Sequence, residues 1–317
     1  MKRKISYAKW GYIFLIPFFV VYCVFALMPL VETFKYSVID YVVQQGAAPS
    51  VRNPQGGADV IVNNGFCGLK NFKDVLGKGG IFSLSFKSTI ILWLVGFVPQ
   101  IVFSLLLASW YTDIRLKLKA QGFFKTVMYM PNVIMASALS LLFYSLFVQD
   151  GALDTLFGHP DLLNKVWGAR GVVGFINFLM WYGNTTIMLM AAMMGIDTSL
   201  YEAAQIDGAN PTQVFWQITI PLIKPILAYV IVTSMIGGLQ MYDVPYLIGG
   251  TAGNPNGALK TLVSQIQLGK NSSVGKVSAL SVLVFIVSAV LGFVTLKVMD
   301  DKSIKTMYGK KKKKEGK

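Results

Sequence analysis

The chain has 317 residues, of which 54% are hydrophobic and 14% charged, and its formal net charge is +14 at pH 7. Ordinary soluble domains are roughly 45–50% apolar and about 25% charged, so this composition indicates a membrane protein and argues against a soluble enzyme. The excess of basic residues could suggest nucleic-acid binding, but their positions sort by the two sides of a membrane instead.

Six long apolar segments dominate the sequence, and each approaches or exceeds the roughly 20 residues that a helix needs to cross a bilayer. Backbone amides in hydrocarbon must be hydrogen bonded within the segment, so runs of this length predict helices and not barrel strands. The fold class is therefore all-α, a polytopic membrane protein with six transmembrane helices in a single domain over residues 1–317. The predicted spans are residues 10–34, 86–111, 124–148, 171–196, 222–247 and 276–299.

The first apolar segment follows a basic start, as in a signal peptide. It is too long for a signal-peptide core and is interrupted by Pro17 and Pro29, so we expect a retained first helix. Lysine and arginine are concentrated before this helix, between the second and third helices and after the last one, which places both termini in the cytoplasm. The basic tail at residues 310–317 is expected to touch anionic lipid headgroups and not nucleic acid.

The sequence carries little that could support catalysis. The single histidine, His159, lies in a predicted outer loop, and no second His, Cys or carboxylate cluster stands at ligand spacing. Cys23 lies within a span and Cys67 in the long outer loop over residues 37–87, so these two are not expected to pair. That loop is rich in Gly, Asn and Pro, and we expect part of it to lack regular order. No catalytic residue, metal site or cofactor is predicted.

One cytoplasmic segment, residues 197–221, is neither short nor rich in lysine. It is predicted to form two short helices joined by a break. Ser199 is a good N-cap for the first helix, with Glu202 three residues later at the spacing of a capping box. Gly208 can end this helix because glycine tolerates a left-handed backbone.

The second helix begins directly after the break. Asn210 can cap it, Pro211 fits its first turn, and Pro221 is expected to stop it just before the fifth span. Carboxylates in the segment offer charge-assisted bonds to a partner, small residues permit close approach, and an apolar side can pack against the protein's own helices. The residues with these properties are Glu202 and Asp207, Ala203 and Ala204, and Val214, Phe215 and Ile218. The segment is therefore suited to docking into a groove of a partner.

This segment resembles the signature loop of the maltose-type, carbohydrate-importing permeases of ABC transporters, the binding-protein-dependent inner-membrane components. That loop reads Glu-Ala-Ala, two variable residues, Asp-Gly-Ala, and then Phe, Ile and Leu-Pro at set intervals. The matching residues are Glu202-Ala203-Ala204, Asp207-Gly208-Ala209, Phe215, Ile218, Pro221 and Pro225, with Ile220 where leucine is usual. Weaker likenesses extend over nearly the whole chain, among them Leu15-Ile16-Pro17, Gly68-Leu69-Lys70-Asn71-Phe72 and Tyr242-Asp243-Val244-Pro245-Tyr246.

The resemblance implies the ABC type I importer permease fold and a mechanism. Two different permease subunits form the path, two ATPase subunits dock beneath them, and an extracytoplasmic solute-binding protein delivers the sugar. The loop would couple ATP hydrolysis to transport through Glu202, Ala203, Ala204, Asp207, Gly208 and Pro221. The chain would then be a non-catalytic subunit in the bacterial cytoplasmic membrane, and it has no phosphate-binding loop of its own. Each of these residues also has a purely structural interpretation. In that interpretation Glu202 does no more than cap its helix, and Gly208 does no more than allow the turn.

Polar residues within the spans are candidates for the substrate path, because sugars need hydrogen-bonding partners. They are Asn132, Asn177, Asn184, Gln240 and Asp243. Buried polar groups also bridge helices in membranes, and the sequence does not separate the two roles. Trp93, Trp110 and Trp181 are expected to be interfacial anchors or packing residues and not platforms for sugar rings.

Three alternatives stay open at this point. A related permease could carry glycerol phosphate or a similar polyol, although the central part of every span lacks Asp, Glu, Lys, Arg and His, which favours a neutral saccharide. A secondary transporter would carry ionisable residues inside its spans, and a membrane-embedded enzyme would need a cluster of histidine or carboxylate groups. The sequence shows neither feature. No motif identifies the particular sugar.

Overall fold

The computed structural model describes residues 8–44, 60–77, 79–113, 120–158, 160–269 and 273–299. The predicted basic tail at 310–317 and His159 lie outside these residues. So do most of the basic residues before the first helix and between the second and third spans.

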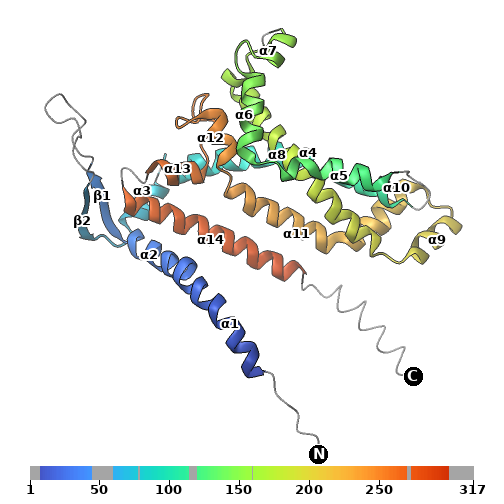
Figure 1. Cartoon of the computed structure of the whole chain (residues 1–317), viewed down its shortest axis with the longest axis horizontal. Coiled ribbons are helices and arrows are strands. Elements are labelled where there is room, and N and C mark those ends of the chain that lie inside the picture. Colours follow the sequence, from blue (N-terminus) through green and yellow to red (C-terminus); the bar gives the residue numbers. More distant parts are fainter. Residues whose placement is uncertain are drawn as a thin grey trace, which may run out of the picture. The chain divides into compact units, whose positions relative to one another are not determined.

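Six helical stretches in the described residues are long and apolar enough to cross a membrane, which confirms the all-α class with six transmembrane helices. They cover Gly11–Ser37, Ile81–Thr112, Ala136–Leu156, Val166–Met194, Pro211–Leu239 and Val274–Lys297. Figure 1 labels the α-helices and the two β-strands. In chain order the elements are α1 (Ala8–Tyr22), η1 (Cys23–Leu27), α2 (Met28–Ser37), β1 (Ile39–Gln44), β2 (Val60–Phe66), α3 (Lys70–Leu76), α4 (Ile81–Thr112), α5 (Gln121–Val133), α6 (Ala136–Phe147), α7 (Ala152–Leu156), η2 (Leu162–Asn164), α8 (Val166–Met194), α9 (Thr198–Ile206), α10 (Pro211–Val214), η3 (Phe215–Thr219), α11 (Ile220–Leu239), α12 (Asp243–Gly249), α13 (Leu262–Gly269) and α14 (Val274–Met299).

Packing divides the chain into two compact units, and each is described by itself. The first comprises Met1–Ser83 and Gln265–Phe285, and the second Leu84–Ser264 and Ile286–Lys317. In the first unit, β1 and β2 form an antiparallel hairpin in the long outer loop, where no strand was predicted. Both strands are rich in valine and isoleucine, residues that favour strands, but the Gly, Asn and Pro between them dominate the composition of the loop.

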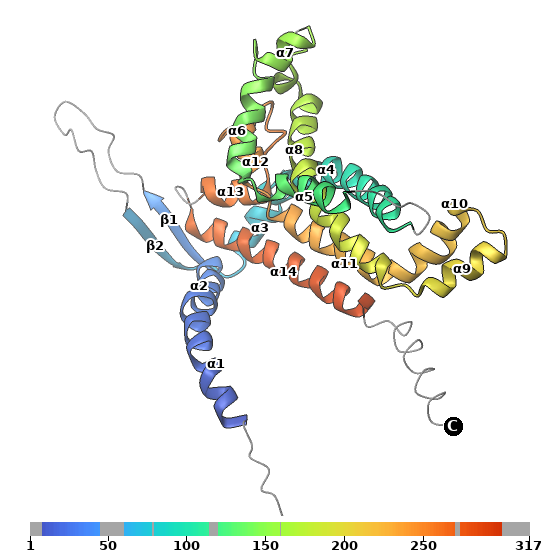
Figure 2. The ribbon, with the colours of Figure 1, turned by 45° about the vertical axis from the view of Figure 1, so that its right-hand side comes forward.

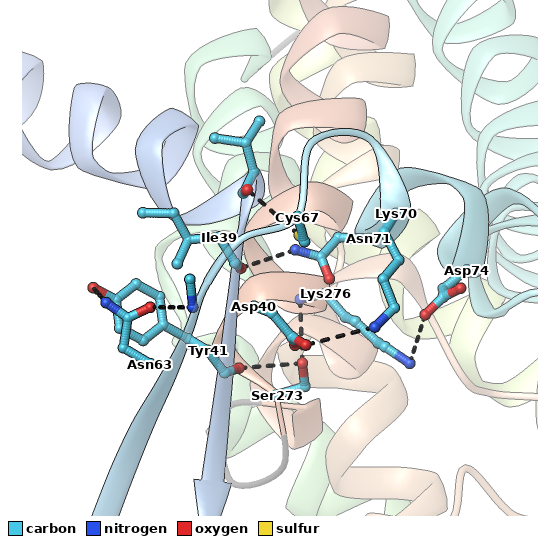
Figure 3. A network of polar contacts seen from close by, with 12 residues as sticks. Ile39, Asp40, Tyr41, Asn63, Cys67, Lys70, Asn71, Asp74, Ser273 and Lys276 are labelled. Carbon is cyan, nitrogen blue, oxygen red and sulfur yellow. Dashed lines mark hydrogen bonds and ion pairs between the residues drawn. The ribbon is translucent and has the colours of Figure 1, made fainter.

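Asn71 of α3 holds the first unit together at the end of the first span (Figure 3). Its side chain is buried, and its amide donates to the carbonyl oxygens of Ser37 and Ile39, each at 3.0 Å. The start of α14 approaches the same amide at Gly275, where a Cβ would lie 2.7 Å from the Asn71 nitrogen. One amide therefore joins α2, β1 and α14.

An exposed ion pair lies beside this amide, between Lys276 and Asp74 at 2.9 Å (Figure 3). The hydrogen bond and charge of Lys276 lower the pKa of the Asp74 carboxyl. The pair therefore persists at neutral pH and is lost only as the pH falls through that lowered pKa.

Replacing Asn71 by leucine should destabilise the first unit, because it leaves buried carbonyl groups without their donor. We expect a loss of about 1–3 kcal/mol, the cost of leaving buried polar groups unpaired. The measurement is the rate at which a protease cleaves the hairpin in membranes. Asn64→Leu is the matched control, because Asn64 is an exposed residue of β2. Equal cleavage of the two variants would show that the Asn71 contacts do not stabilise the unit.

In the second unit, α8 is the central helix. Half of its most apolar window is buried, a larger share than in any other span found in the described residues. It meets α4 where Gly96 faces Gly174, and it meets α5 where Gly183 lies against the backbone of Met128. Small residues at such crossings let membrane helices pack closely. Side-chain hydrogen bonds add to the α4–α8 contact, such as that from Ser104 to the Tyr182 carbonyl at 2.9 Å.

The fifth span begins earlier than predicted, because Pro221 does not stop the preceding helix. The helical backbone continues through the π-helical segment η3 into α11, with Pro221 in the first turn of α11. A proline in a helix clashes with the carbonyl four residues before it, here that of Gln217, and a locally wider π turn relieves this clash. Pro29 follows the π segment η1 in the same way.

Two predicted spans are interrupted. The third was predicted as one helix over 124–148, but α5 ends at Val133 and Ile134 has an extended backbone before α6 starts. The fifth was predicted to run to residue 247, but α11 ends at Leu239 after Gly237 and Gly238, and α12 starts anew at Asp243. Paired glycines have low helix propensity, which explains the end of α11.

Candidate functional site

A cavity of about 330 Å³ lies between α4, α8 and α11 in the second unit. Ligand cavities in proteins typically measure roughly 300–1,000 Å³, so this one is large enough for a small molecule. The lining residues are Trp93, Gly96, Phe97 and Gln100 of α4; Asn177, Trp181, Asn184, Thr185 and Met188 of α8; Tyr229, Val230, Thr233, Ser234, Gly237 and Gly238 of α11; and Met241.

The cavity lies near the middle of the spans, between two apolar clusters. One cluster includes Leu92 and Ile176, which precede the lining residues on α4 and α8. The other includes Ala108 and Leu189, which follow the lining residues on the same two helices. The cavity thus lies between two apolar clusters, and its lining combines polar and apolar groups.

Several lining side chains are already fixed by hydrogen bonds. Gln100 donates to the Thr185 hydroxyl at 2.8 Å, and the Trp93 indole donates to the Ser234 hydroxyl at 3.1 Å. Asn184 differs, because its amide makes no hydrogen bond with any residue that the structure describes. That amide can offer two donors and one acceptor to a bound molecule.

The lining combines amides, hydroxyls and aromatic rings, and none of its residues is Asp, Glu, Lys, Arg or His. A charged ligand would have no counter-ion among these side chains, and burial of an unpaired charge is costly. The cavity therefore suits a neutral molecule that carries several hydroxyl groups and has apolar faces.

Two of the five residues predicted for the substrate path lie together in this cavity, namely Asn177 and Asn184. Asn132 lies elsewhere and donates to the Met180 carbonyl at 3.0 Å, so it joins α5 to α8. Gln240 and Asp243 are exposed at the break between α11 and α12 and do not line the cavity.

The tryptophans divide differently from the prediction. Trp93 and Trp181 line the cavity, whereas Trp110 is 60% exposed on α4, as expected of a residue at the lipid interface. Gln100 and Ser234 were not predicted, although an amide or hydroxyl in the middle of an apolar span is a visible signal. Which polar residues face each other depends on helix rotation, which the near-uniform apolar surface of α4 does not reveal.

The segment predicted to dock a partner forms an elbow of α9 and α10 at the start of α11 (Figure 2). The cap of α9 is Asp197 and not Ser199 as predicted, because the Asp197 carboxylate accepts from the Ser199 amide at 3.0 Å. Gly208 ends α9 with φ of +75°, as predicted. The amide of Ala209 then donates to the Ala204 carbonyl at 2.9 Å, which completes a Schellman motif.

The second half of the elbow follows the prediction more closely. Asn210 accepts from the Gln213 amide at 2.8 Å, and the Gln213 side chain accepts from the Asn210 amide at 2.9 Å, so the two form a capping box. Pro211 lies in the first turn of α10. These caps hold the elbow rigidly at the end of α11.

The outer face of the elbow has the chemistry expected of a docking surface. Glu202, Ala203, Asp207 and Gly208 are exposed, whereas Ala204 is buried against the protein. Ile206 was not singled out from the sequence, yet it is 87% exposed. An aliphatic side chain between two carboxylates suits a groove with an apolar floor and basic rim.

The inner face of the elbow is tied to the spans. The Tyr201 hydroxyl lies 3.3 Å from the Thr219 hydroxyl, which joins α9 to η3. Phe215 packs on the apolar cluster that contains Leu189 and Ile223. Displacement of α9 would therefore be passed to the start of α11.

Comparison with known proteins identifies the family. Residues 100–303 match the family described as "Binding-protein-dependent transport system inner membrane component". The chain belongs to this family. As a member, the permease is a multi-pass membrane component of an ABC transport system and not an enzyme. The match includes α8, α11 and the elbow, and it begins within α4.

Relatives of this permease align over almost its whole length. The "Multiple sugar-binding transport system permease protein MsmF" of Streptococcus mutans is 28% identical over 93% of this chain and 97% of that protein. The "Trehalose/maltose transport system permease protein MalF" of Thermococcus litoralis is 28% identical over 94% and 96%. A solved chain from "a bacterial ABC transporter involved in the import of the acidic polysaccharide alginate" has the same fold, with a TM-score of 0.70 at 18% identity over 92% and 95%.

Proposed function

We propose that this permease carries a neutral saccharide, as a subunit of an ATP-driven importer. The observation that supports this most is the cavity between α4, α8 and α11, which is lined by amides, hydroxyls and aromatic rings without a charged side chain. Saccharides present hydroxyl groups on their edges and apolar C–H faces, which match such a lining. The sugar substrates in the names of MsmF and MalF support the same class of substrate.

A glycerol phosphate or similar polyol phosphate is a weaker candidate. Phosphate is recognised by Arg, Lys or helix N-termini, and no basic side chain lines the cavity. A secondary transporter is also disfavoured, because its coupling ion requires ionisable groups that the lining lacks.

The elbow is proposed as the site where an ATPase subunit docks. Glu202 and Asp207 would pair with basic groups of the ATPase, Ala203 and Gly208 would allow close approach, and Ile206 would enter an apolar pocket. Ala204 and Pro221 would act from within, by fixing α9 on the protein and by setting the start of α11. This arrangement is supported by the rigid caps of the elbow and its direct continuation into α11.

The full assembly would contain a second, different permease subunit, two ATPase subunits and an extracytoplasmic solute-binding protein. One solved neighbour of this fold was crystallised with a "periplasmic protein" bound to an alginate pentasaccharide, which supports the last of these partners. We place the assembly in the bacterial cytoplasmic membrane with both termini in the cytoplasm, because the basic residues are concentrated in the segments assigned to that side. We also expect contacts with membrane lipid, and we expect no nucleic-acid partner.

The decisive experiment is sugar-stimulated ATPase activity of the assembled complex in lipid vesicles, with Glu202→Ala compared with native protein. Loss of a charge-assisted bond costs about 1.5–3 kcal/mol, so we expect ATPase binding to weaken by about ten- to hundredfold. Glu32→Ala is the matched control, because Glu32 is also exposed but lies at the end of the first span. Sugar uptake that continues in the complete absence of an ATPase subunit would refute the proposed function.

A further inference from the structure

The three helices around the cavity differ in the contacts that join them to one another. α4 and α8 cross closely, since a Cβ on Gly96 would lie 3.2 Å from the Gly174 carbonyl oxygen. The hydrogen bond between Gln100 and Thr185 and the one from Ser104 to the Tyr182 carbonyl join the same two helices at successive turns. These contacts make α4 and α8 a rigid pair.

At the cavity, Trp93 joins α11 to α4, and α11 also packs on α8 in the apolar cluster that contains Val230 and Leu189. The indole nitrogen of Trp93 donates to the Ser234 hydroxyl at 3.1 Å. The ring stacks on Phe97 with centroids 5.0 Å apart and an interplanar angle of 14°. It also lies on Gly238, where a Cβ would be 2.5 Å from the ring. The Trp93 side chain is therefore packed between Phe97 of its own helix and Gly238 of α11.

The N-terminal end of α11, which follows the elbow, is the part that would receive motion from a partner docked there. It continues from the elbow through η3 without a break, and Tyr201 joins η3 to α9 through Thr219. A displacement of the elbow therefore reaches Ser234 along one helix, while α4 and α8 stay together. The hydrogen bond from Trp93 to Ser234 is a contact that such a displacement would strain.

We propose that Trp93 is a positioning residue that latches α11 to α4, and that the cavity opens when its hydrogen bond to Ser234 breaks. The role of the latch in transport rests on the proposed function, but the hydrogen bond between Trp93 and Ser234 does not depend on what the permease carries. Opening would free one donor, the indole N–H, and one hydroxyl that accepts and donates. A saccharide hydroxyl can pair with both, so bound sugar would favour the open arrangement by its differential affinity for it.

The test is the rate at which N-ethylmaleimide labels a cysteine at Val230, a lining residue that is only 3% exposed. Native Cys23 and Cys67 are first replaced by alanine and serine. In the assembled membrane complex, Trp93→Phe keeps an aromatic side chain but removes the five-membered ring with its N–H donor, and Ser234→Ala removes only the acceptor. Each should raise the labelling rate about three- to tenfold, the range expected for one neutral hydrogen bond. The double variant should label no faster than the faster single variant, because both remove the same bond.

Two controls separate the loss of the latch from a general loosening of the helix packing. Trp110→Phe changes an exposed tryptophan on α4 and should leave labelling at Val230→Cys unchanged. A reporter at Ala108→Cys is fully buried outside the cavity lining, and its labelling should not respond to Trp93→Phe. Equal rates in Trp93→Phe and Trp110→Phe would overturn the latch, as would a parallel rise at Ala108→Cys. Labelling needs neither ATP nor sugar, so it decides on the latch even if uptake without an ATPase subunit refutes ATP-driven transport.

Discussion

Gly183→Ala should strongly destabilise the native packing of the second unit. A Cβ at this position would overlap the carbonyl oxygen of Met128 and lie 2.7 Å from its carbonyl carbon. Both atoms belong to the backbone of α5, so no side-chain rotation relieves the overlap and the helices must separate. Overpacking of this kind costs about 3 kcal/mol or more. We expect the midpoint of thermal unfolding in detergent, followed by size-exclusion chromatography, to fall by about 5–10 °C.

Gly171→Ala on the same helix is the matched control. No heavy atom lies within 4 Å of its Cβ position, and the residue is exposed. Alanine there should raise stability by about 0.5–1 kcal/mol, because glycine is the poorer helix former. The two substitutions thus have opposite expected signs. A similar unfolding midpoint for both variants would mean that α5 and α8 do not cross at Gly183.

The sequence predicted six membrane spans because a bilayer imposes a simple rule on the length and composition of a helix that crosses it. Their interruptions were missed because the break at Ile134 lies within a segment without charged residues, although Pro131 and Asn132 come just before it. The proline rule failed at Pro221, since a π turn absorbs the clash that would end an ordinary α-helix. The hairpin was missed because strand-forming valines are outnumbered in that loop by residues that favour turns.

The elbow was predictable in detail because its structure is local. Gly208 and Asn210 act on amides within a few residues, so sequence spacing alone indicates their roles. The cap of α9 was misplaced by two residues, because Asp197 and Ser199 are both good caps and only the backbone decides between them. The cavity was only partly predictable. Asn184 and Gln100 come from helices far apart in sequence, and no single sequence shows that they face each other.

Transport should depend more strongly on Asn184 than on any other residue predicted for the substrate path. Its amide lines the cavity and makes no hydrogen bond with the described part of the chain, so its removal leaves no protein group unpaired. Asn184→Leu should therefore fold normally and still bind the ATPase. The loss of two hydrogen bonds to a sugar corresponds to about ten- to hundredfold weaker uptake. Uptake into vesicles of radiolabelled trehalose and maltose, the sugars in the name of MalF, measures this loss.

Gln240→Leu supplies the comparison, since it makes the same change from amide to aliphatic at an exposed position outside the lining. Uptake there should stay within about twofold of native, as for most surface substitutions. Asn184→Asp adds a sharper test of the neutral lining. A carboxylate would be buried without a counter-ion among the lining residues, so uptake of a neutral sugar should fall at neutral pH and recover as the carboxylate is protonated at lower pH. If Asn184→Leu and Gln240→Leu transported equally well, the sugar would have to pass outside the cavity between α4, α8 and α11.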